Sequence, residues 1–312
     1  MRVLVTGSQG FVGRHMIREL RKAGMTASAF DLSEDDGLLP GLEYCRGDIQ
    51  DQEAVRQAVK KFLPAACIHL GGLAFVPEGW TNTEALLSVN TIGTINLLEA
   101  FRQYSPSAAI LVVSSSEVYG RPAGIKSADE NTPLSPDNPY AVSKSAADRI
   151  TLLYARQYSM RALVARPSNH IGPGQSPSFA VPSFAAQLGA IAAGKSPPAI
   201  KVGNLESKRD FTDVRDVVRA YRMLIENGRA GEAYNIASGR EISLRIILEK
   251  LIEIFKVKPE IEVAQERFRR PEPRPILNTA KIEKEIGWKP EIDIMNTTLR
   301  DIAAGQTTMT QS

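Results

Sequence analysis

A tyrosine and a lysine four residues apart form the pair best suited to proton transfer in this chain. Tyr140 and Lys144 lie in the run Tyr-Ala-Val-Ser-Lys, and residues i and i+4 share one face of a helix. A nearby ammonium lowers the pKa of a phenol, so the spacing predicts a tyrosine that exchanges a proton with a hydroxyl or carbonyl oxygen near neutral pH. Since this spacing is common by chance, the interpretation depends on two further features: the serine cluster at 114–116 and a glycine-rich turn near the N-terminus.

The glycine-rich turn holds Gly7, Gly10 and Gly13 at the spacing G-x-x-G-x-x-G, between the apolar run 3–5 and a helix that ends at Gly24. Gly7 permits a tight turn, Gly10 lets the backbone approach a pyrophosphate, and Gly13 lets the helix pack on the strand. The unpaired N–H groups of the helix N-terminus suit phosphate oxygens. The sequence therefore predicts a dinucleotide site. The alternative is that the glycines serve packing alone.

Asp31 ends a second predicted strand, 27–30, about 20 residues beyond the turn. A carboxylate there accepts hydrogen bonds from the adenine-ribose hydroxyls and repels a 2′-phosphate, which favours NADH. Leu32 and Ser33 offer no arginine for that phosphate, but Arg14 lies on the neighbouring helix, so NADPH remains the alternative cofactor. The competing interpretation of Asp31 is a carboxylate that caps a turn.

Strand and helix patterns alternate regularly up to residue 166. Besides the elements around the glycine turn, the periodicity predicts strands over 42–46, 65–70, 109–113 and 161–166, and helices over 51–63, 83–104 and 139–159. This alternation indicates an α/β fold, a Rossmann-like doubly wound parallel sheet with helices on both faces. Its right-handed crossovers would place the glycine and serine turns at one edge, the carboxyl ends of the strands.

Beyond residue 167 the pattern loosens. Prolines and glycines gather at 167–177 and 194–203, and shorter helices are predicted near 180–193, 214–227, 243–256 and 279–286. We therefore expect residues 1–166 to form the dinucleotide-binding domain. Residues 167–312 would form mainly a smaller α/β substrate-binding cap, partly interwoven with the first domain, with the active-site cleft between the two.

Charge and composition limit the partners. A net charge of +3 gives no argument for nucleic acid, and 43% hydrophobic with 23% charged residues is ordinary for a globular protein. One local exception is the basic stretch 267–274, which prolines interrupt; it is either a solvated loop or a contact to an anionic ligand.

The expected compartment is the cytoplasm, with no membrane contact. No run of 18 apolar residues occurs, and the first apolar run is immediately a core strand rather than a cleavable leader. Cys45 and Cys67 are interpreted as reduced, small apolar fillers. No metal-ligand spacing is present, so no metal is expected.

Three motifs together resemble the extended short-chain dehydrogenases/reductases that modify nucleotide sugars: Thr6-Gly-x-x-Gly-Phe-Val-Gly13, Ser114-Ser-Ser-Glu-Val-Tyr-Gly120 and Tyr140-x-x-x-Lys144. The resemblance implies that Ser115 is the catalytic hydroxyl, Tyr140 the acid/base, and Lys144 its pKa-lowering partner and nicotinamide-ribose contact. It further implies cofactor contacts by Gly7, Gln9, Gly10, Phe11, Val12, Gly13, Asp31, Leu32, Asp48, Ile49, Leu70, Gly71, Gly72, Asn90, Tyr140, Lys144 and Arg166.

The second half is similar to GDP-4-keto-6-deoxymannose reductases and to their close relatives, the GDP-mannose 4,6-dehydratases, over Arg166–Pro177 and Gly203–Asp216. This likeness implies substrate contacts by Ser116, Glu117, Asn169, Val181, Asn204, Arg209 and Arg270, with Arg270 on the diphosphate, since guanidinium geometry suits phosphate oxygens. The chain departs from the family at His69-Leu-Gly-Gly72 and at Leu73-Ala74, where Ala-Ala and Gln-Ser are usual. A polar sugar contact is therefore expected to be missing.

The implied activity is reduction of the 4-keto group of GDP-4-keto-6-deoxy-D-mannose to GDP-D-rhamnose with NAD(P)H. Tyr140 would supply the proton and Ser115 would polarise the ketone. One alternative is a 4,6-dehydratase or another nucleotide-sugar epimerase/dehydratase, with Glu117 as the base that removes the C5 proton. Another is a non-catalytic sensor of NAD or a nucleotide sugar. A homodimer is expected to pair through the helices 83–104 and 139–159.

Overall fold

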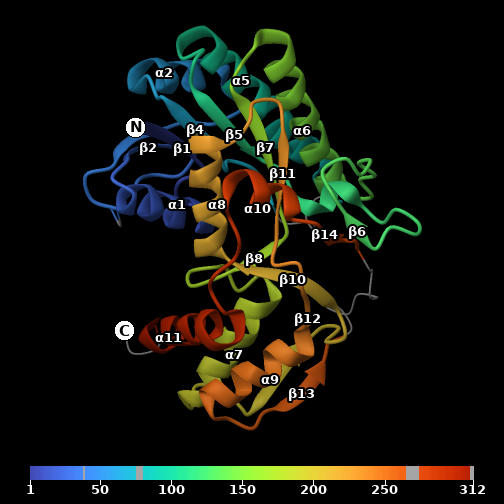
Figure 1. Ribbon diagram of the computed structural model, residues 1–312. Helices are drawn as coiled ribbons and strands as arrows, with labels where there is room; N and C mark the ends of the chain where they lie inside the picture. The colour runs from blue at the N-terminus through green and yellow to red at the C-terminus, as the bar shows by residue number, and fades with distance from the viewer. Residues whose placement is uncertain (38, 75–79, 265–273, 310–312) are drawn as a thin grey trace.

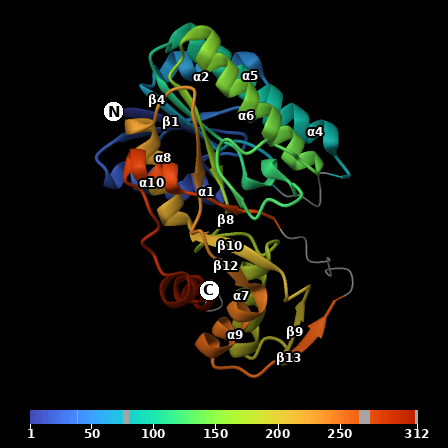
Figure 2. The same cartoon turned by 45° about the vertical axis from the view of Figure 1, so that its right-hand side comes forward.

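The computed structural model describes residues 1–37, 39–74, 80–264 and 274–309. A large sheet with helices on both faces forms one part, and a smaller group of helices and short strands lies below it in Figure 1. The two parts meet around β8 (Asn169–Ile171) and β10 (Lys208–Asp213), as the turned view in Figure 2 also shows.

The large sheet has seven strands in the order β11-β7-β5-β4-β1-β2-β3, and every neighbouring pair is parallel. Its strands are β1 (Arg2–Thr6), β2 (Thr26–Asp31), β3 (Glu43–Arg46), β4 (Ala66–His69), β5 (Ala109–Val113), β7 (Ala162–Pro167) and β11 (Ala233–Ile236). In register, Val3 of β1 lies between Ala27 of β2 and Ala66 of β4. The predicted doubly wound parallel sheet is confirmed.

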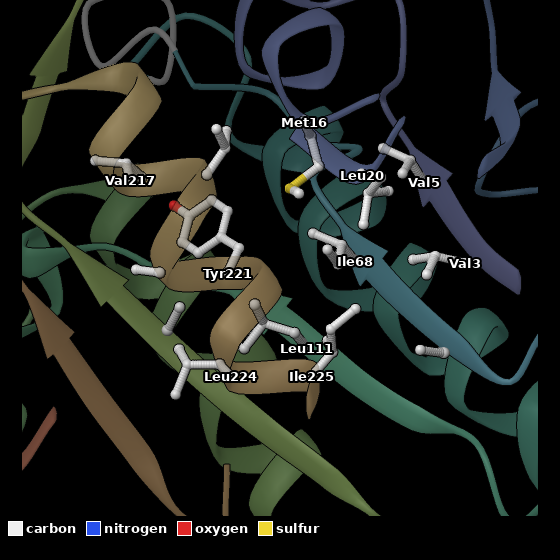
Figure 3. Close-up of a cluster of buried hydrophobic side chains, with 14 of the residues drawn as sticks. Val3, Val5, Met16, Leu20, Ile68, Leu111, Val217, Tyr221, Leu224 and Ile225 are labelled. Atoms are coloured by element: carbon white, nitrogen blue, oxygen red, sulfur yellow. The ribbon is translucent and has the colours of Figure 1, made fainter. Parts of the chain in front are cut away.

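Alternate residues of β1 supply two separate cores. Val3 and Val5 pack against α1 (Phe11–Lys22) and α8 (Val214–Asn227), as Figure 3 shows. Leu4 faces the opposite layer, made by α2 (Gln52–Phe62), α5 (Gly93–Tyr104) and α6 (Pro139–Tyr158). Each fully buried large apolar side chain contributes roughly 1.5–3 kcal/mol. Helices therefore pack on both faces of the sheet, and this packing fixes the positions of the strand ends.

Helix α6 starts at a well-defined cap. Asn138 accepts a hydrogen bond from Ala141 N at 2.8 Å, and Pro139 occupies the first helical position, where its missing N–H costs nothing. The helix ends at Ser159, which has a left-handed conformation with φ 54°. Tyr140 consequently sits in the first turn, at the end of α6 that faces the carboxyl edge of the sheet.

The long predicted helix 83–104 is built from three continuous segments: α4 (Thr83–Leu87), the π-helical turn η1 (Ser88–Ile92) and α5. Single π turns interrupt α-helices frequently at functional sites. Here the turn contains Asn90, one of the expected cofactor residues.

The smaller part contains strands that the sequence pattern did not predict. Among the described residues, three sheets occur there or at its border: β12 (Glu241–Ser243) with β10 and β8, β13 (Glu260–Val263) with β9 (Ala199–Val202), and β14 (Ile276–Leu277) with β6 (Ser127–Ala128). The helices α7 (Ala180–Ala192), α9 (Leu244–Phe255) and α11 (Leu299–Met309), preceded by η4 (Ile294–Thr298), share an apolar core.

The chain returns to the large sheet after residue 167. β11 pairs in parallel with β7, and α8 and α10 (Ala280–Ile286) pack on the face that α1 covers. Residues after 167 thus supply elements to both parts, and the division at 166/167 stays a prediction.

Candidate active site

The glycine turn joins β1 to α1 at the carboxyl edge of the sheet. Gly7 has φ +69°, and a Cβ on it would lie 2.7 Å from Gly71 N, while a Cβ on Gly13 would lie 2.2 Å from Gly7 O. Both positions therefore exclude side chains. Gly10 is the N-cap of α1 and no side chain caps this N-terminus, so its first N–H groups remain available to an anion.

Asp31 ends β2 beside this turn and holds two backbone N–H groups. Its Oδ2 accepts from Gln9 N at 2.9 Å and its Oδ1 from Ser33 N at 3.0 Å. The carboxylate thus does cap the turn, while its position at the end of β2 is also the one expected for a ribose contact. Arg14, on α1, forms an ion pair with Asp36 and donates to Gln9 O at 2.9 Å.

Buried polar side chains fix the end of β4. Thr6 Oγ1 lies 2.7 Å from His69 Nδ1 and accepts from Gly71 N at 3.1 Å, and His69 Nε2 lies 3.2 Å from Thr94 Oγ1. Burial lowers the pKa of His69 to about 3, with the Lys144 charge adding to the effect. The imidazole is therefore neutral and holds the segment before Gly72 in place.

Asn90 in η1 holds the next segment. Its Oδ1 accepts from Leu73 N at 2.8 Å, and its Nδ2 donates to Leu73 O at 3.1 Å and to Ser143 Oγ at 2.9 Å. A Cβ at Gly72 would lie 2.6 Å from Asn90 Oδ1 and 3.3 Å from Lys144 Nζ. Gly72, at this departure from the family pattern, therefore packs closely against Asn90 and leaves no room for a side chain.

The end of β5 and the start of α6 bring together Ser115, Tyr140 and Lys144. The Tyr140 hydroxyl is hydrogen-bonded to Ser115, whose Oγ also accepts from Glu117 N at 3.2 Å. Lys144 Nζ donates to Val113 O at 2.9 Å. All three side chains are buried.

The electrostatics of this group differ from the expectation. Burial raises the pKa of Tyr140 to about 12; the Ser115 hydrogen bond opposes this rise and the Glu117 charge adds to it. Burial also lowers the pKa of Lys144 to about 8. The predicted lowering of the tyrosine pKa by the ammonium is therefore not what this structure gives, because desolvation dominates and the ammonium is engaged by Val113 O. Tyr140 is a protonated acid at neutral pH.

A pocket opens beside this group, between the large sheet and the smaller part. It is lined by Ser116, Glu117, Ser168, Asn169, Lys208, Arg209, Asp210, Glu241, Arg274, Pro275, Ile276 and Leu277. Four of the expected substrate residues, Ser116, Glu117, Asn169 and Arg209, thus meet in one pocket. Sequence reasoning missed Lys208 and Ser168, which directly neighbour Arg209 and Asn169 in the motifs.

Two other expected substrate residues lie elsewhere, and a third falls outside the described residues. Val181 is buried in the apolar core of α7, α9 and α11, and Asn204 Oδ1 accepts from Glu206 N at 2.9 Å in a local turn, so neither lines the pocket. Arg270 lies outside the described residues. Arg274, from the same basic stretch, does reach the pocket: its Nη2 lies 2.8 Å from Glu117 Oε2.

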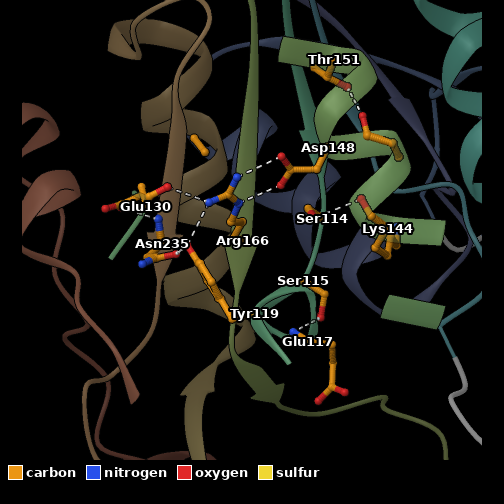
Figure 4. A network of polar contacts seen from close by, with 12 residues as sticks. Ser114, Ser115, Glu117, Tyr119, Glu130, Lys144, Asp148, Thr151, Arg166 and Asn235 are labelled. Carbon is orange, nitrogen blue, oxygen red and sulfur yellow. Dashed lines mark hydrogen bonds and ion pairs between the residues drawn. The ribbon is translucent and has the colours of Figure 1, made fainter. Parts of the chain in front are cut away.

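Arg166 is held in a buried network of polar contacts. Its guanidinium pairs with both oxygens of Asp148 on α6, at 2.7 and 3.0 Å, and also donates to Tyr119 Oη at 3.0 Å and Glu130 O at 3.2 Å (Figure 4). Arg166 and Asp148 are almost fully buried. This network ties α6 to β7, one turn beyond Lys144, and the cofactor contact of Arg166 stays a prediction.

The remaining expected cofactor residues lie around the carboxyl edge of the large sheet. Phe11 stacks on His170 with ring centroids 6.3 Å apart, and Asp48 Oδ1 accepts from Gln50 N at 2.9 Å. Ile49 is buried, Leu32 is exposed, and Val12 and Leu70 are partly buried. The uncapped N-terminus of α1 and the close glycine contacts at Gly7 and Gly13 fit a dinucleotide, whose pyrophosphate the first N–H groups of α1 would hold.

Two absences among the described residues bear on other classes of protein. These residues contain no group of three or more histidine, cysteine, aspartate or glutamate side chains placed to hold a metal ion. None of the described helices combines the length and the apolar character needed to cross a membrane.

A glycine turn opening a doubly wound sheet, with Ser115, Tyr140 and Lys144 at its carboxyl edge, defines an extended short-chain dehydrogenase/reductase. The profile of the family described as GDP-mannose 4,6 dehydratase matches residues 4–300, and the chain belongs to this family. GDP-6-deoxy-D-mannose reductase of Pseudomonas aeruginosa is 38% identical over 302 residues, covering 94% of this chain and 93% of the relative. The resemblance inferred from the motifs is thereby confirmed.

Solved structures agree with this assignment. The structure of RMD from Pseudomonas aeruginosa complexed with NADPH is 36% identical, with a TM-score of 0.87 over 99% of both chains. UDP-glucose 4-epimerase of Thermus thermophilus, in complex with NAD, is 28% identical, with a TM-score of 0.87 over 98% of this chain and 99% of the other. A nicotinamide cofactor is common to both neighbours.

Proposed function

We propose that this enzyme reduces the 4-keto group of GDP-4-keto-6-deoxy-D-mannose to a hydroxyl, giving GDP-D-rhamnose. The observation that carries the proposal is a buried Tyr140, protonated at neutral pH and hydrogen-bonded to Ser115, next to a pocket that contains Arg209 and Asn169. Reduction of a ketone requires a proton donor, and a phenol with a pKa of about 12 keeps its proton until the ketone oxygen becomes basic. The 38% identity to a reductase supports the choice of substrate.

Each residue of the group has a distinct task. The nicotinamide supplies the hydride that the ketone carbon receives. Tyr140 gives its proton to the ketone oxygen, and Ser115 donates a hydrogen bond to the same oxygen as it gains charge. The Lys144 ammonium stabilises the phenolate that Tyr140 becomes. Arg209 and Asn169 would contact the nucleotide sugar, and Arg270 its diphosphate.

NADH is proposed as the favoured cofactor and NADPH as the alternative. Asp31 at the end of β2 disfavours a 2′-phosphate, and the following loop adds the carboxylates of Glu34, Asp35 and Asp36. Arg14 is engaged by Asp36, which reduces its ability to attract a phosphate. The Pseudomonas aeruginosa structure, by contrast, is complexed with NADPH, and this observation favours the alternative cofactor.

A homodimer through α4–α5 and α6 is proposed on the basis of exposed apolar side chains. Leu87, Ile92, Val142, Leu153 and Tyr158 lie on these helices and are 38–52% exposed. Pairing two copies of this face would remove these side chains from water. The cytoplasmic location stays a prediction.

The test is a comparison of three 4-keto-6-deoxy sugars carrying GDP, dTDP or UDP, each with NADH or NADPH, followed by absorbance at 340 nm and product NMR. The proposal expects one mole of reduced cofactor consumed per mole of GDP-sugar and the highest kcat/KM for the GDP substrate. GDP-mannose with catalytic oxidised cofactor is the control, because a dehydratase recycles its cofactor. Turnover of GDP-mannose without reduction of the keto-sugar would contradict the proposal.

A further inference from the structure

The carboxylate of Glu117 is held by an arginine that comes from a distant part of the chain. Arg274 Nη2 lies 2.8 Å from Glu117 Oε2 and 3.1 Å from Asp137 Oδ1, and Asn138 Nδ2 donates to Glu117 Oε2 at 3.2 Å. The side chains of Arg274 and Glu117 are only 17% and 23% exposed. Both line the pocket, so the ion pair is part of the surface that a substrate meets.

The backbone fixes the arginine in this position. Two residues after Arg274, β14 pairs in parallel with β6: Ile276 lies opposite Ser127, and Ile276 N donates to Lys126 O at 3.0 Å. Arg274 Nη1 is buried and has no hydrogen-bond partner among the described residues, so the guanidinium contacts carboxylates through one nitrogen and keeps a second donor in the pocket wall.

The position of Glu117 matters because of the substrate. The hydrogens on the carbons next to a ketone are acidic, and a carboxylate in the pocket of a 4-keto sugar is a general base for them. In a reductase, removal of a proton from a carbon next to the ketone is a side reaction, because it scrambles the configuration of carbon 5 or carbon 3 before reduction. A carboxylate in an ion pair must give up that pair to accept a proton.

We propose that Arg274 is a specificity-determining residue that holds Glu117 in an ion pair and so keeps it from acting as a base on the ketosugar. The inference rests on the proposed function. Arg274 thereby separates reduction, which needs Tyr140 as proton donor and Ser115 as hydrogen-bond donor, from the enolisation that begins a dehydratase or epimerase reaction.

The suppressed step balances without a redox partner. Glu117 takes the proton from the carbon next to the ketone, and the electron pair of the broken C–H bond forms the C=C bond of the enolate, whose oxygen is hydrogen-bonded by Tyr140 and Ser115. Return of a solvent proton to that carbon restores the ketone. In D2O the returning group is a deuteron, so each cycle leaves one deuterium on the sugar.

The experiment is therefore deuterium exchange into GDP-4-keto-6-deoxy-D-mannose in D2O, with oxidised cofactor bound so that no reduction competes, read by mass spectrometry and NMR. The wild type is expected to exchange no faster than the enzyme-free solution. Arg274→Gln is expected to exchange at least about tenfold faster, since a positioned base contributes about 10²–10⁴. The double variant Arg274→Gln with Glu117→Gln should return to the enzyme-free rate.

Arg121→Gln is the matched control, because Arg121 also pairs with Asp137 but no contact with Glu117 is seen for it among the described residues. It should not raise the exchange. Arg274→Lys keeps a positive charge without the planar fork and should give an intermediate rate. If Arg274→Gln does not fold, as judged by thermal unfolding, Arg274→Lys replaces it in the experiment.

The outcomes separate the two proposals. Exchange by a folded Arg274 variant at the enzyme-free rate overturns the inference, and so does a wild type that already exchanges as fast as the variant. Reduction of the same substrate by the wild type with NADH or NADPH is measured in parallel. Absence of that reduction contradicts the proposed function, whatever the exchange rates are.

Discussion

Raising the pH from 7 to 9 should lower kcat/KM about tenfold, because the ammonium of Lys144 loses its proton in that range. Burial lowers the pKa of this group from 10.5 to about 8. At that value about 90% of the enzyme carries the charge at pH 7 and about 10% at pH 9. Tyr140, with a pKa raised to about 12, keeps its proton throughout, so the alkaline limb belongs to Lys144.

The fold should not be what fails over this range. The unfolded chain has the higher lysine pKa, so between pH 8 and about 10 it binds more protons than the folded chain, and this group makes folding more favourable as the pH rises. Loss of activity and thermal stability should therefore separate. The buried tyrosines reverse the trend only above about pH 10, where they ionise more readily in the unfolded chain.

The assay is kcat/KM from pH 6.5 to 9.5 with the keto-sugar substrate and reduced cofactor, alongside the melting temperature at each pH. Lys144→Arg is the comparison: its charge persists over the whole range, so its alkaline limb should vanish even where its absolute rate is lower. A flat wild-type profile between pH 7 and 9, or an unchanged limb in Lys144→Arg, would refute the reasoning.

Four further predictions address other parts of the account. Tyr140→Phe should lower kcat about 10²–10⁴-fold while cofactor titration stays normal, and near-normal kcat would remove the tyrosine from its role. Arg209→Ala should raise KM for the GDP-sugar and leave KM for the cofactor unchanged; an equal rise in both would contradict a contact of Arg209 with the nucleotide sugar. Asp31→Ala should shift the kcat/KM ratio toward NADPH, and a wild type that strongly prefers NADPH would contradict the ribose assignment. Asp148→Asn strands the charge of buried Arg166, so urea unfolding should show a loss of about 3–5 kcal/mol; an unchanged midpoint would argue against the network.

The first half of the fold was predictable because most of its strands, such as β4 and β5, are buried on both faces and therefore form continuous apolar runs. The run 109–113 coincides with β5, and the glycine turn marks the junction of β1 and α1. The strands after residue 167 carry no such signal. β10 includes Lys208, Arg209 and Asp213, and β11 contains the buried Asn235, whose polar atoms are satisfied by Tyr119, Ala128 and Asn278.

The site was predictable where its residues lie in short motifs. Tyr140 and Lys144 could be named from their helical spacing and the serine cluster from its place at a strand end, while the family resemblance singled out Ser115. Contacts that depend on the pairing of strands far apart in the sequence could not be predicted. Arg274 reaches Glu117 only because β14 pairs with β6, and nothing in the sequence encodes that register locally.

The pKa of Tyr140 shows the same limit for electrostatics. The i, i+4 spacing with Lys144 is correct, but whether the ammonium or burial dominates depends on the neighbours that surround both groups. The competing acceptor, Val113 O, comes from β5, not from the helix that carries the pair.

The most direct test of the central claim uses a cofactor deuterated at both hydrogens of C4 of the reduced nicotinamide and GDP-4-keto-6-deoxy-D-mannose in ordinary water. The expected product is GDP-D-rhamnose with one deuterium at carbon 4 of the sugar and none at carbon 5, in step with cofactor oxidation. Unlabelled product, or release of oxidised cofactor with the keto-sugar unchanged, would contradict it.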